Sequence, residues 1–152
     1  MGVPYTIINK QCNTMALSIY NSTLSAENKI HTAPHVSNCS DLSQVFRLQT
    51  ASGYYEILSA LGLGSIQWTW NMHLHYDSDP TPTIARAKAQ YSQFSLQLVD
   101  ATNFYTIRVR ESPQASFYYS GIRNDIGVDV LTMVPPDPGN HTHLWGFVQC
   151  PK

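Results

Sequence analysis

The sequence predicts an all-β domain built from three tandem units of about fifty residues. Each unit opens on the same short pattern, because residues 5–8, 55–58 and 105–108 all begin with tyrosine and are spaced by 50 residues. Each unit also closes on a large aromatic followed two positions later by another apolar residue, the spacing of one strand face. These closing pairs are Phe46 and Leu48, Phe94 and Leu96, and Trp145 and Phe147. Apolar residues make up 43% of the chain and charged residues only 12%, which disfavours a helical bundle.

Two more strands are expected within each unit. The second strands are predicted at residues 15–20, 65–70 and 116–119, and the third strands at residues 28–32, 83–86 and 127–131. Four strands in three copies give twelve, the number found in a β-trefoil. We therefore predict one β-trefoil domain over residues 1–152, with units at 4–52, 53–102 and 103–150. An unrelated β-sandwich is the alternative fold.

The expected core consists of the apolar positions on the inner strand faces, since one four-stranded unit cannot bury its apolar face alone. These residues are Tyr5, Ile7, Leu17, Ile19, Ile30, Phe46, Leu48, Tyr55, Ile57, Ile66, Trp68, Ile84, Phe94, Leu96, Tyr105, Ile107, Val128, Val130, Trp145 and Phe147. Because the core uses most of the aromatic and aliphatic residues, function is expected on the loops.

Charge and hydropathy exclude several classes of partner. The net charge is -1 and no basic stripe is present, so nucleic acid is not an expected partner. No apolar run is long enough for a transmembrane helix, so no membrane association is expected. The N-terminal residues lack the features of a signal peptide, which favours a cytoplasmic location, with removal of a targeting segment as the open alternative. No exposed apolar strand pattern is visible, and we expect a monomer.

Cysteine usage and motifs argue against catalysis. Cys12, Cys39 and Cys150 are expected to be free thiols, with one disulfide and one remaining thiol as the open alternative. No nucleophile elbow, phosphate-binding loop or zinc-protease helix is present, so no catalytic residue and no cofactor are predicted. The pairs His73 and His75, and His141 and His143, would each share one face of an extended segment. No further ligand completes a metal signature, and we predict no metal site.

Carbohydrate binding is the main alternative function. Sugar sites combine a carboxylate or amide with an aromatic side chain, and ricin-type lectins are also β-trefoils. The lectin pattern Gln-x-Trp is degraded here, since it occurs as 44–46 with phenylalanine and lacks its glutamine before Trp145. The candidate carboxylates and aromatics are Asp41, Asp77, Asp79, Asp100, Asp125, Tyr20, Trp70, Tyr76, Tyr118 and Tyr119.

The third unit resembles a known family. Residues 104–108, 126–130 and 145–147 look like the C-terminal third of the mycocypins, fungal β-trefoil inhibitors of cysteine proteases typified by clitocypin. Fungal relatives of this group inhibit serine and aspartic proteases. The resemblance implies a non-catalytic inhibitor of cysteine or aspartic proteases, which inserts loops into the cleft of its partner. Loops fixed at both ends by barrel strands lose little entropy on binding.

By position, the resemblance assigns inhibition to the first and third inter-strand loops, 9–14 and 34–41. The family's legumain-inhibiting loop uses an asparagine, whereas residues 60–64 here contain two leucines among glycines and alanine. These leucines would suit the apolar subsites of an aspartic protease. The predicted protease-binding residues are Asn9, Lys10, Gln11, Cys12, Asn13, His35, Val36, Ser37, Asn38, Leu61, Gly62 and Leu63. For a trypsin-like target, the available cations are Lys10, Lys29 and Arg123.

Overall fold

The structure, a computed structural model, describes residues 3–19, 25–51, 53–61, 64–66, 83–86, 93–99, 103–110, 116–118, 129–130, 132–134 and 137–151. These residues form thirteen strands and two 3-10 turns, and no α-helix occurs among them, which confirms the all-β prediction for this part of the chain. The strands are β1 (Pro4–Asn9), β2 (Met15–Ile19), β3 (Ser25–Pro34), β4 (Phe46–Ala51), β5 (Tyr54–Ser59), β6 (Gly64–Ile66), β7 (Thr83–Arg86), β8 (Phe94–Leu98), β9 (Phe104–Val109), β10 (Ser116–Tyr118), β11 (Asp129–Val130), β12 (Thr132–Val134) and β13 (Trp145–Gln149). The turns are η2 (Leu42–Gln44) and η3 (His141–His143). In the described part of the chain, no helix has the length and apolarity needed to cross a membrane.

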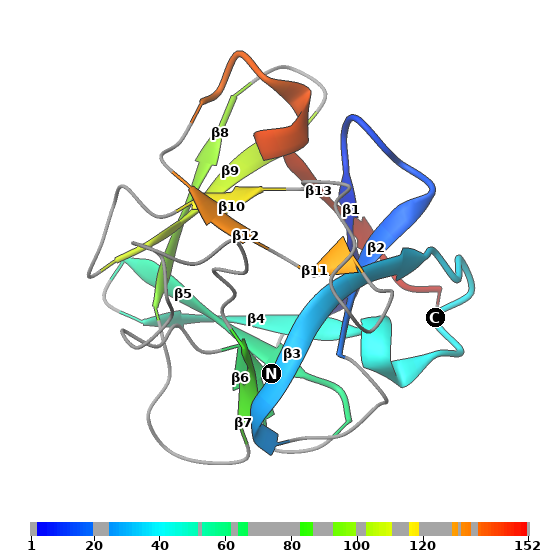
Figure 1. The fold of residues 1–152 in the computed structure, drawn as a ribbon. Helices are drawn as coiled ribbons and strands as arrows, with labels where there is room; N and C mark the ends of the chain where they lie inside the picture. Colours follow the sequence, from blue (N-terminus) through cyan, green and yellow to red (C-terminus); the bar gives the residue numbers. More distant parts are fainter. Residues whose placement is uncertain are drawn as a thin grey trace.

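Six strands close into a barrel (Figure 1). Antiparallel pairs run in a ring from β1 to β4, β5, β8, β9 and β13, and β13 returns to β1. The opening strands β1, β5 and β9 each place an isoleucine opposite the closing strand next to them. The register pairs are Ile7 with Phe147, Ile57 with Leu48, and Ile107 with Leu96. A closed ring leaves no free edge in the barrel.

Three hairpins join the barrel at the carboxyl ends of β1, β5 and β9. They are β2–β3, β6–β7 and β10–β12, and β3 also pairs with β7 and β11. The described strands do not confirm the expected count of twelve, since β11 falls within the segment predicted at 127–131 and β12 begins just after it, at Thr132. Strand β11 pairs with β3, and β12 pairs with β10. Strand β3 is longer than predicted, and the start of β6 precedes its expected position by one residue.

The centre of the barrel contains a subset of the predicted core. Ile7, Leu17, Ile19, Phe46, Ile57, Phe94, Ile107 and Trp145 are fully buried as predicted, and Ala16, Val45, Leu144 and Cys150 are also buried. Tyr5, Leu48, Tyr55, Leu96, Tyr105 and Phe147 are only half-buried, which corrects their assignment to the closed core. They lie toward the barrel end away from the hairpins. Trp68 and Val128 lie outside the described residues, and the side chains of Ile30, Ile66, Ile84 and Val130 are not described.

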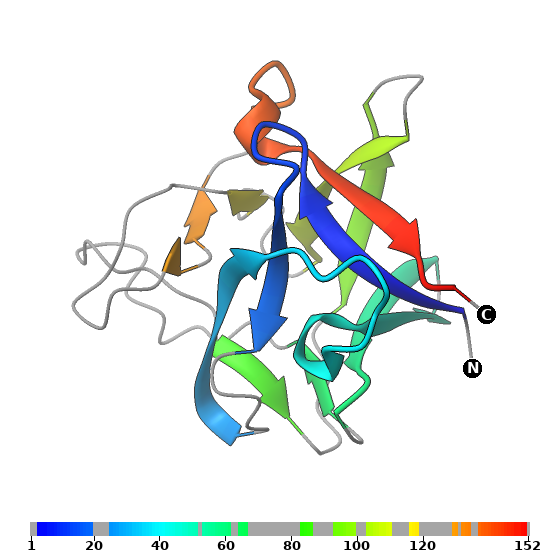
Figure 2. The same cartoon turned by 90° about the vertical axis from the view of Figure 1, so that its right-hand side faces the viewer.

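The amino end of β1 and the segment after β13 lie side by side at the barrel end away from the hairpins (Figure 2). The backbone N–H of Cys150 donates to the carbonyl of Pro4 at 2.9 Å. Cys150 also forms a disulfide with Cys39, 111 positions earlier in the chain. The prediction of three free thiols is therefore wrong for this pair, and Cys12 is the remaining thiol. Sequence reasoning could not choose between these states, because the two cysteines approach only when the barrel closes.

Candidate functional site

The first predicted loop, between β1 and β2, is organised from inside by Asn9. The Asn9 side chain is fully buried, and its amide donates to the carbonyls of Thr142 (3.0 Å) and Leu144 (3.3 Å). Its carbonyl oxygen accepts from the backbone N–H groups of Gln11 and Cys12. Asn9 therefore shapes the loop and is not available to contact a partner, which corrects its place among the predicted contact residues.

The third predicted loop, between β3 and β4, is fixed by Gln44. The Gln44 side chain accepts from the N–H of Val36 (2.9 Å) and donates to the carbonyl of Pro34 (2.7 Å). Asp41 caps η2, since its carboxylate accepts from the backbone and the hydroxyl of Ser43. The glutamine of the degraded Gln-x-Trp pattern thus has a structural role, because both the oxygen and the nitrogen of its amide form hydrogen bonds within the protein.

These two loops lie side by side. The N–H of His35 donates to the carbonyl of Thr14 at 2.8 Å, and His35 Nε2 shares a hydrogen bond with the Thr6 hydroxyl at 2.8 Å. We call this region the paired-loop face, defined by the exposed residues Gln11, Asn13, Thr14, Ser37 and Asn38. Lys10, Cys12, His35 and Val36 are half-buried around it. The structure thus brings the first two predicted segments together.

The remaining predicted residues have separate positions. Leu61 is half-buried beside the end of the third loop, where the N–H of Ala60 donates to the carbonyl of Val45. Gly62 and Leu63 lie outside the described residues. The Lys10 ammonium lies 5.3 Å from the centre of the Phe104 ring, so this cation does not project freely as a trypsin-like target would require. The side chain of Lys29 and all of Arg123 are also outside the described part.

The loop before β13 resembles the third loop, because it also contains a 3-10 turn capped by a polar side chain. Asn140 caps η3 as Asp41 caps η2, and its side chain accepts from the N–H and hydroxyl of Thr142. His143 occupies the position of Gln44, and its Nδ1 accepts from the N–H of Asp137 at 3.2 Å. Because η3 is a 3-10 turn, His141 is exposed while His143 is buried. The two imidazoles therefore do not share one face, contrary to the expectation for an extended segment.

The buried, hydrogen-bonded position of His143 predicts that the stability of the protein depends on pH. Burial lowers the pKa of His143, and the Asp137 carboxylate opposes this shift only in part. Because the pKa in the folded state is below its ordinary value of 6.5, the folded protein loses stability as the pH falls below 6.5. The variant His143→Gln supplies an uncharged acceptor, as Gln44 does in the equivalent loop. We expect unfolding free energies at about pH 7.5 and about pH 5.5 to differ less in this variant than in the natural protein. An unchanged difference would show that His143 does not carry the effect.

Few of the residues predicted to bind sugar or metal lie in the part of the chain that the structure describes. Asp41 is engaged as a cap, whereas Asp77, Asp79, Asp100, Asp125, Tyr20, Trp70, Tyr76 and Tyr119 lie outside the described residues, as do His73 and His75. The side chain of Tyr118 is not described. Within the described ranges, no three histidine, cysteine, aspartate or glutamate side chains gather as metal ligands.

The described residues form a further concave site that the sequence did not suggest. It is a pocket of about 300 Å³ at the barrel end away from the hairpins. Its walls include the six residues that were expected in the core and are half-buried, together with Asn103. The equal spacing of Tyr5, Tyr55 and Tyr105 is the signal that could have indicated it, since equivalent positions in a closed barrel face a common axis.

The closed six-stranded barrel with its hairpins defines the fold class as a β-trefoil, and solved structures support this assignment. The Rhizoctonia solani agglutinin has a TM-score of 0.76 at 11% identity, covering 98% of this chain and 96% of that one. The designed threefold-symmetric protein ThreeFoil has a TM-score of 0.75 at 15% identity, covering 96% of this chain and 98% of that one. The Macrolepiota procera ricin B-like lectin, solved with lactose, has a TM-score of 0.71 at 14% identity, covering 97% and 96%. These identities establish a shared fold alone.

No protein-family model matches the sequence, and none of the curated protein sequences matches it. The mycocypin resemblance of the third unit therefore has no support from these comparisons. Two of these neighbours of the same fold, an agglutinin and a ricin B-like lectin, are each matched over 96% of their chain.

Proposed function

We propose that this protein binds carbohydrate as a β-trefoil lectin and has no catalytic activity. The observation that carries the proposal is the match over nearly the full length of both chains with the Rhizoctonia solani agglutinin and the Macrolepiota procera lectin. The match covers 96% of each of these two chains. We also propose that the domain consists of three units at 4–52, 53–102 and 103–150, consistent with the ring of barrel strands.

The described residues also supply a suitable chemistry. Neutral sugars are bound by aromatic rings that pack on the C–H face of the sugar and by a few polar groups that bind its hydroxyls. The half-buried tyrosines at the barrel end provide both in one side chain. By contrast, Asp41 and Gln44 in the third loop already use their polar atoms within the protein.

A glycan array together with a lactose titration tests the proposal. Lactose is the first soluble probe because the Macrolepiota procera lectin was solved with it. We expect selective binding to neutral glycans on the array, and calorimetry should detect an affinity in the micromolar to millimolar range. An array without signal, combined with no heat of binding for the neutral sugars, would contradict carbohydrate binding.

Protease inhibition is the second candidate function, and the paired-loop face favours it. Its two loops are joined by the hydrogen bond between His35 and Thr14, and the third loop is also anchored through the Cys39–Cys150 disulfide. Such a pre-organised surface suits insertion into the cleft of a cysteine or aspartic protease, because little conformational entropy is lost on binding. The protein would act as a monomer in the cytoplasm.

Inhibition assays with papain-like, pepsin-like and trypsin-like proteases test this second function. In an inhibitor, the double variant Gln11→Ala/Asn13→Ala should weaken inhibition by about tenfold or more, because both side chains are exposed on the paired-loop face. The matched control Gln97→Ala changes an exposed glutamine on β8 and should leave inhibition unaltered. No inhibition of any of the three classes by the natural protein would exclude this function.

A further inference from the structure

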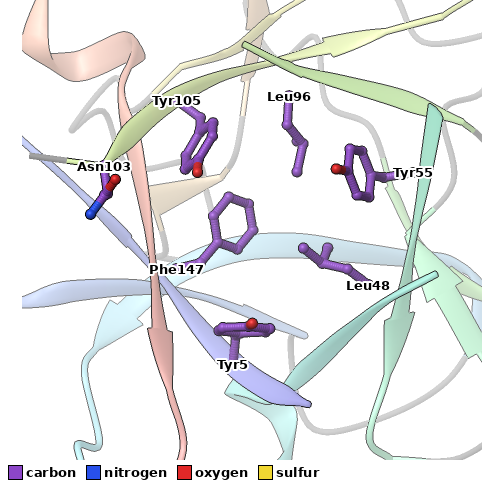
Figure 3. A pocket seen from close by; sticks show the side chains of 7 residues that line it. All are labelled: Tyr5, Leu48, Tyr55, Leu96, Asn103, Tyr105 and Phe147. Atoms are coloured by element: carbon purple, nitrogen blue, oxygen red, sulfur yellow. The ribbon is translucent and has the colours of Figure 1, made fainter. Parts of the chain in front are cut away.

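The pocket at the barrel end has walls contributed by all six barrel strands and by the turn before β9. Tyr5 lies on β1, Leu48 on β4, Tyr55 on β5, Leu96 on β8, Tyr105 on β9 and Phe147 on β13, so each barrel strand supplies one side chain. Asn103, directly before β9, completes the lining. Figure 3 shows the tyrosines, the leucines and Phe147 arranged around one hollow, with Tyr55 and Tyr105 directed inward from opposite sides, and Asn103 at the margin. We call this site the barrel-end pocket.

The three tyrosines occupy equivalent positions, one residue before a buried polar side chain in β1, β5 and β9. None of their hydroxyl groups has a hydrogen-bond partner in the part of the chain that the structure describes. A closed core would favour phenylalanine or leucine at these positions, since a buried hydroxyl without a partner costs free energy. Half-buried tyrosines around a hollow instead leave three hydroxyls available to a ligand.

The aromatic walls are held in place by contacts with one another. Phe147 packs edge-on against Tyr105 at a centroid distance of 5.6 Å and against Tyr5 at 6.2 Å. Edge-to-face pairs of this kind stabilise a fixed arrangement of rings. The rings are therefore positioned before a ligand arrives, which reduces the entropy lost on binding.

Asn103 brings an amide to the edge of the pocket. Its backbone has a φ of +66°, in the left-handed region, and Gly53 has a φ of +84° at the equivalent position 50 residues earlier. Glycine adopts this conformation without steric cost, whereas asparagine is one of the few other residues that tolerate it. The turn before β9 thus has a side chain where the turn before β5 has none, and that side chain lines the pocket.

Size and charge restrict the ligand. A volume of about 300 Å³ is at the lower end for small-molecule sites, which suits one ring with its substituents. Among the described residues, no charged side chain lines the pocket, so an ionic ligand would lose its hydration without a compensating partner from this lining. Aromatic walls with separate hydroxyl and amide groups match a ring that has a C–H face and several hydroxyls.

We infer that the barrel-end pocket binds one neutral pyranose ring, stacked against the aromatic walls and hydrogen-bonded by Tyr5, Tyr55, Tyr105 and Asn103. This inference rests on the proposed carbohydrate binding and assigns it to the axis of the barrel. It predicts one sugar per protein molecule, because a pocket on the axis occurs once, whereas sites on the outer loops could occur once in each unit.

Calorimetric titration with lactose and with the methyl glycosides of galactose, glucose and mannose tests this assignment. The triple variant Tyr5→Phe/Tyr55→Phe/Tyr105→Phe removes only the hydroxyls and should weaken binding by about tenfold or more. Its melting temperature should stay close to that of the natural protein, because no hydrogen bond between described residues is lost. Asn103→Gly should also weaken binding, and Gly53 indicates that this backbone accepts glycine. The matched control Tyr54→Phe changes a tyrosine outside the pocket, whose ring faces Arg110, and should bind as the natural protein does.

The possible outcomes separate the two proposals. A stoichiometry of one with weakened binding in the triple variant, and normal binding by Tyr54→Phe, supports the pocket. Full affinity in the triple variant would overturn the pocket while leaving carbohydrate binding in place at another surface. A natural protein that binds no glycan on the array and none of the titrated sugars would overturn both.

Discussion

Replacing both Cys39 and Cys150 by serine is expected to lower the free energy of unfolding by about 2–5 kcal/mol. The disulfide joins residues separated by 111 positions, so it restricts a large part of the unfolded chain. In the folded protein it ties the third loop to the segment after β13, where the Cys150 N–H also donates to Pro4. Urea denaturation, monitored by tryptophan fluorescence under non-reducing conditions, measures this loss.

Cys12→Ser is the matched control, because Cys12 is the unpaired cysteine and lies half-buried in the first loop. Its effect should stay within about 0.5 kcal/mol, as for most surface substitutions. Adding dithiothreitol should lower the stability of the natural protein to that of the double variant. A double variant as stable as the natural protein would refute the contribution of the bond. Disulfides are rare in reducing compartments, so the redox state of this pair in cells also tests the expected cytoplasmic location.

Trp145→Ala is expected to destabilise the protein by about 3–5 kcal/mol. Trp145 is the largest fully buried side chain among the described residues. It lies opposite Asn9 of β1 and Tyr105 of β9 in the strand register, at the point where β13 joins both neighbours in the ring. Removing the indole therefore leaves a cavity between three barrel strands. A shift of the denaturation midpoint without a change in the m-value would identify a loss of stability alone.

Two further substitutions serve as comparisons for the loss of stability in Trp145→Ala. Trp145→Phe should cost much less, because Phe46 fills the equivalent position in the first unit and is also fully buried. Leu98→Ala removes an apolar side chain that is 53% exposed, and its effect should stay within about 0.5 kcal/mol. A Trp145→Ala variant that loses less than about 1 kcal/mol would show that the barrel collapses around the site.

Much of the barrel followed from sequence pattern. Strands β1, β5 and β9 were located because their apolar residues alternate and recur every 50 positions. The hairpin strands were less well placed: β3 begins at Ser25, three residues before its predicted start, and the described part of the strand expected at 127–131 is β11, residues 129–130. Short strands carry few residues from which a period can be recognised, and their extent depends on the neighbours with which they pair.

The candidate sites were harder to predict than the strands. Asn9 was predicted to contact a protease and Gln44 was part of the degraded lectin pattern, yet both are buried and bind backbone groups of the loops instead. Their partners are distant in the chain or depend on the loop conformation, so no local pattern identifies them. Tyr5, Tyr55 and Tyr105 were assigned to the closed core, because alternation shows which face of a strand turns inward but not how far the interior is filled.

The sequence by itself determined the all-β class, the opening and closing strands of each unit and the residues that face the barrel interior. Those properties depend on local alternation and on a repeat, both of which are visible in one dimension. The tertiary structure decided that Cys39 meets Cys150, that the first and third loops lie side by side, and that three half-buried tyrosines surround a pocket. Each of these depends on distances between segments far apart in the chain, and such distances are fixed only when the six strands close into a ring.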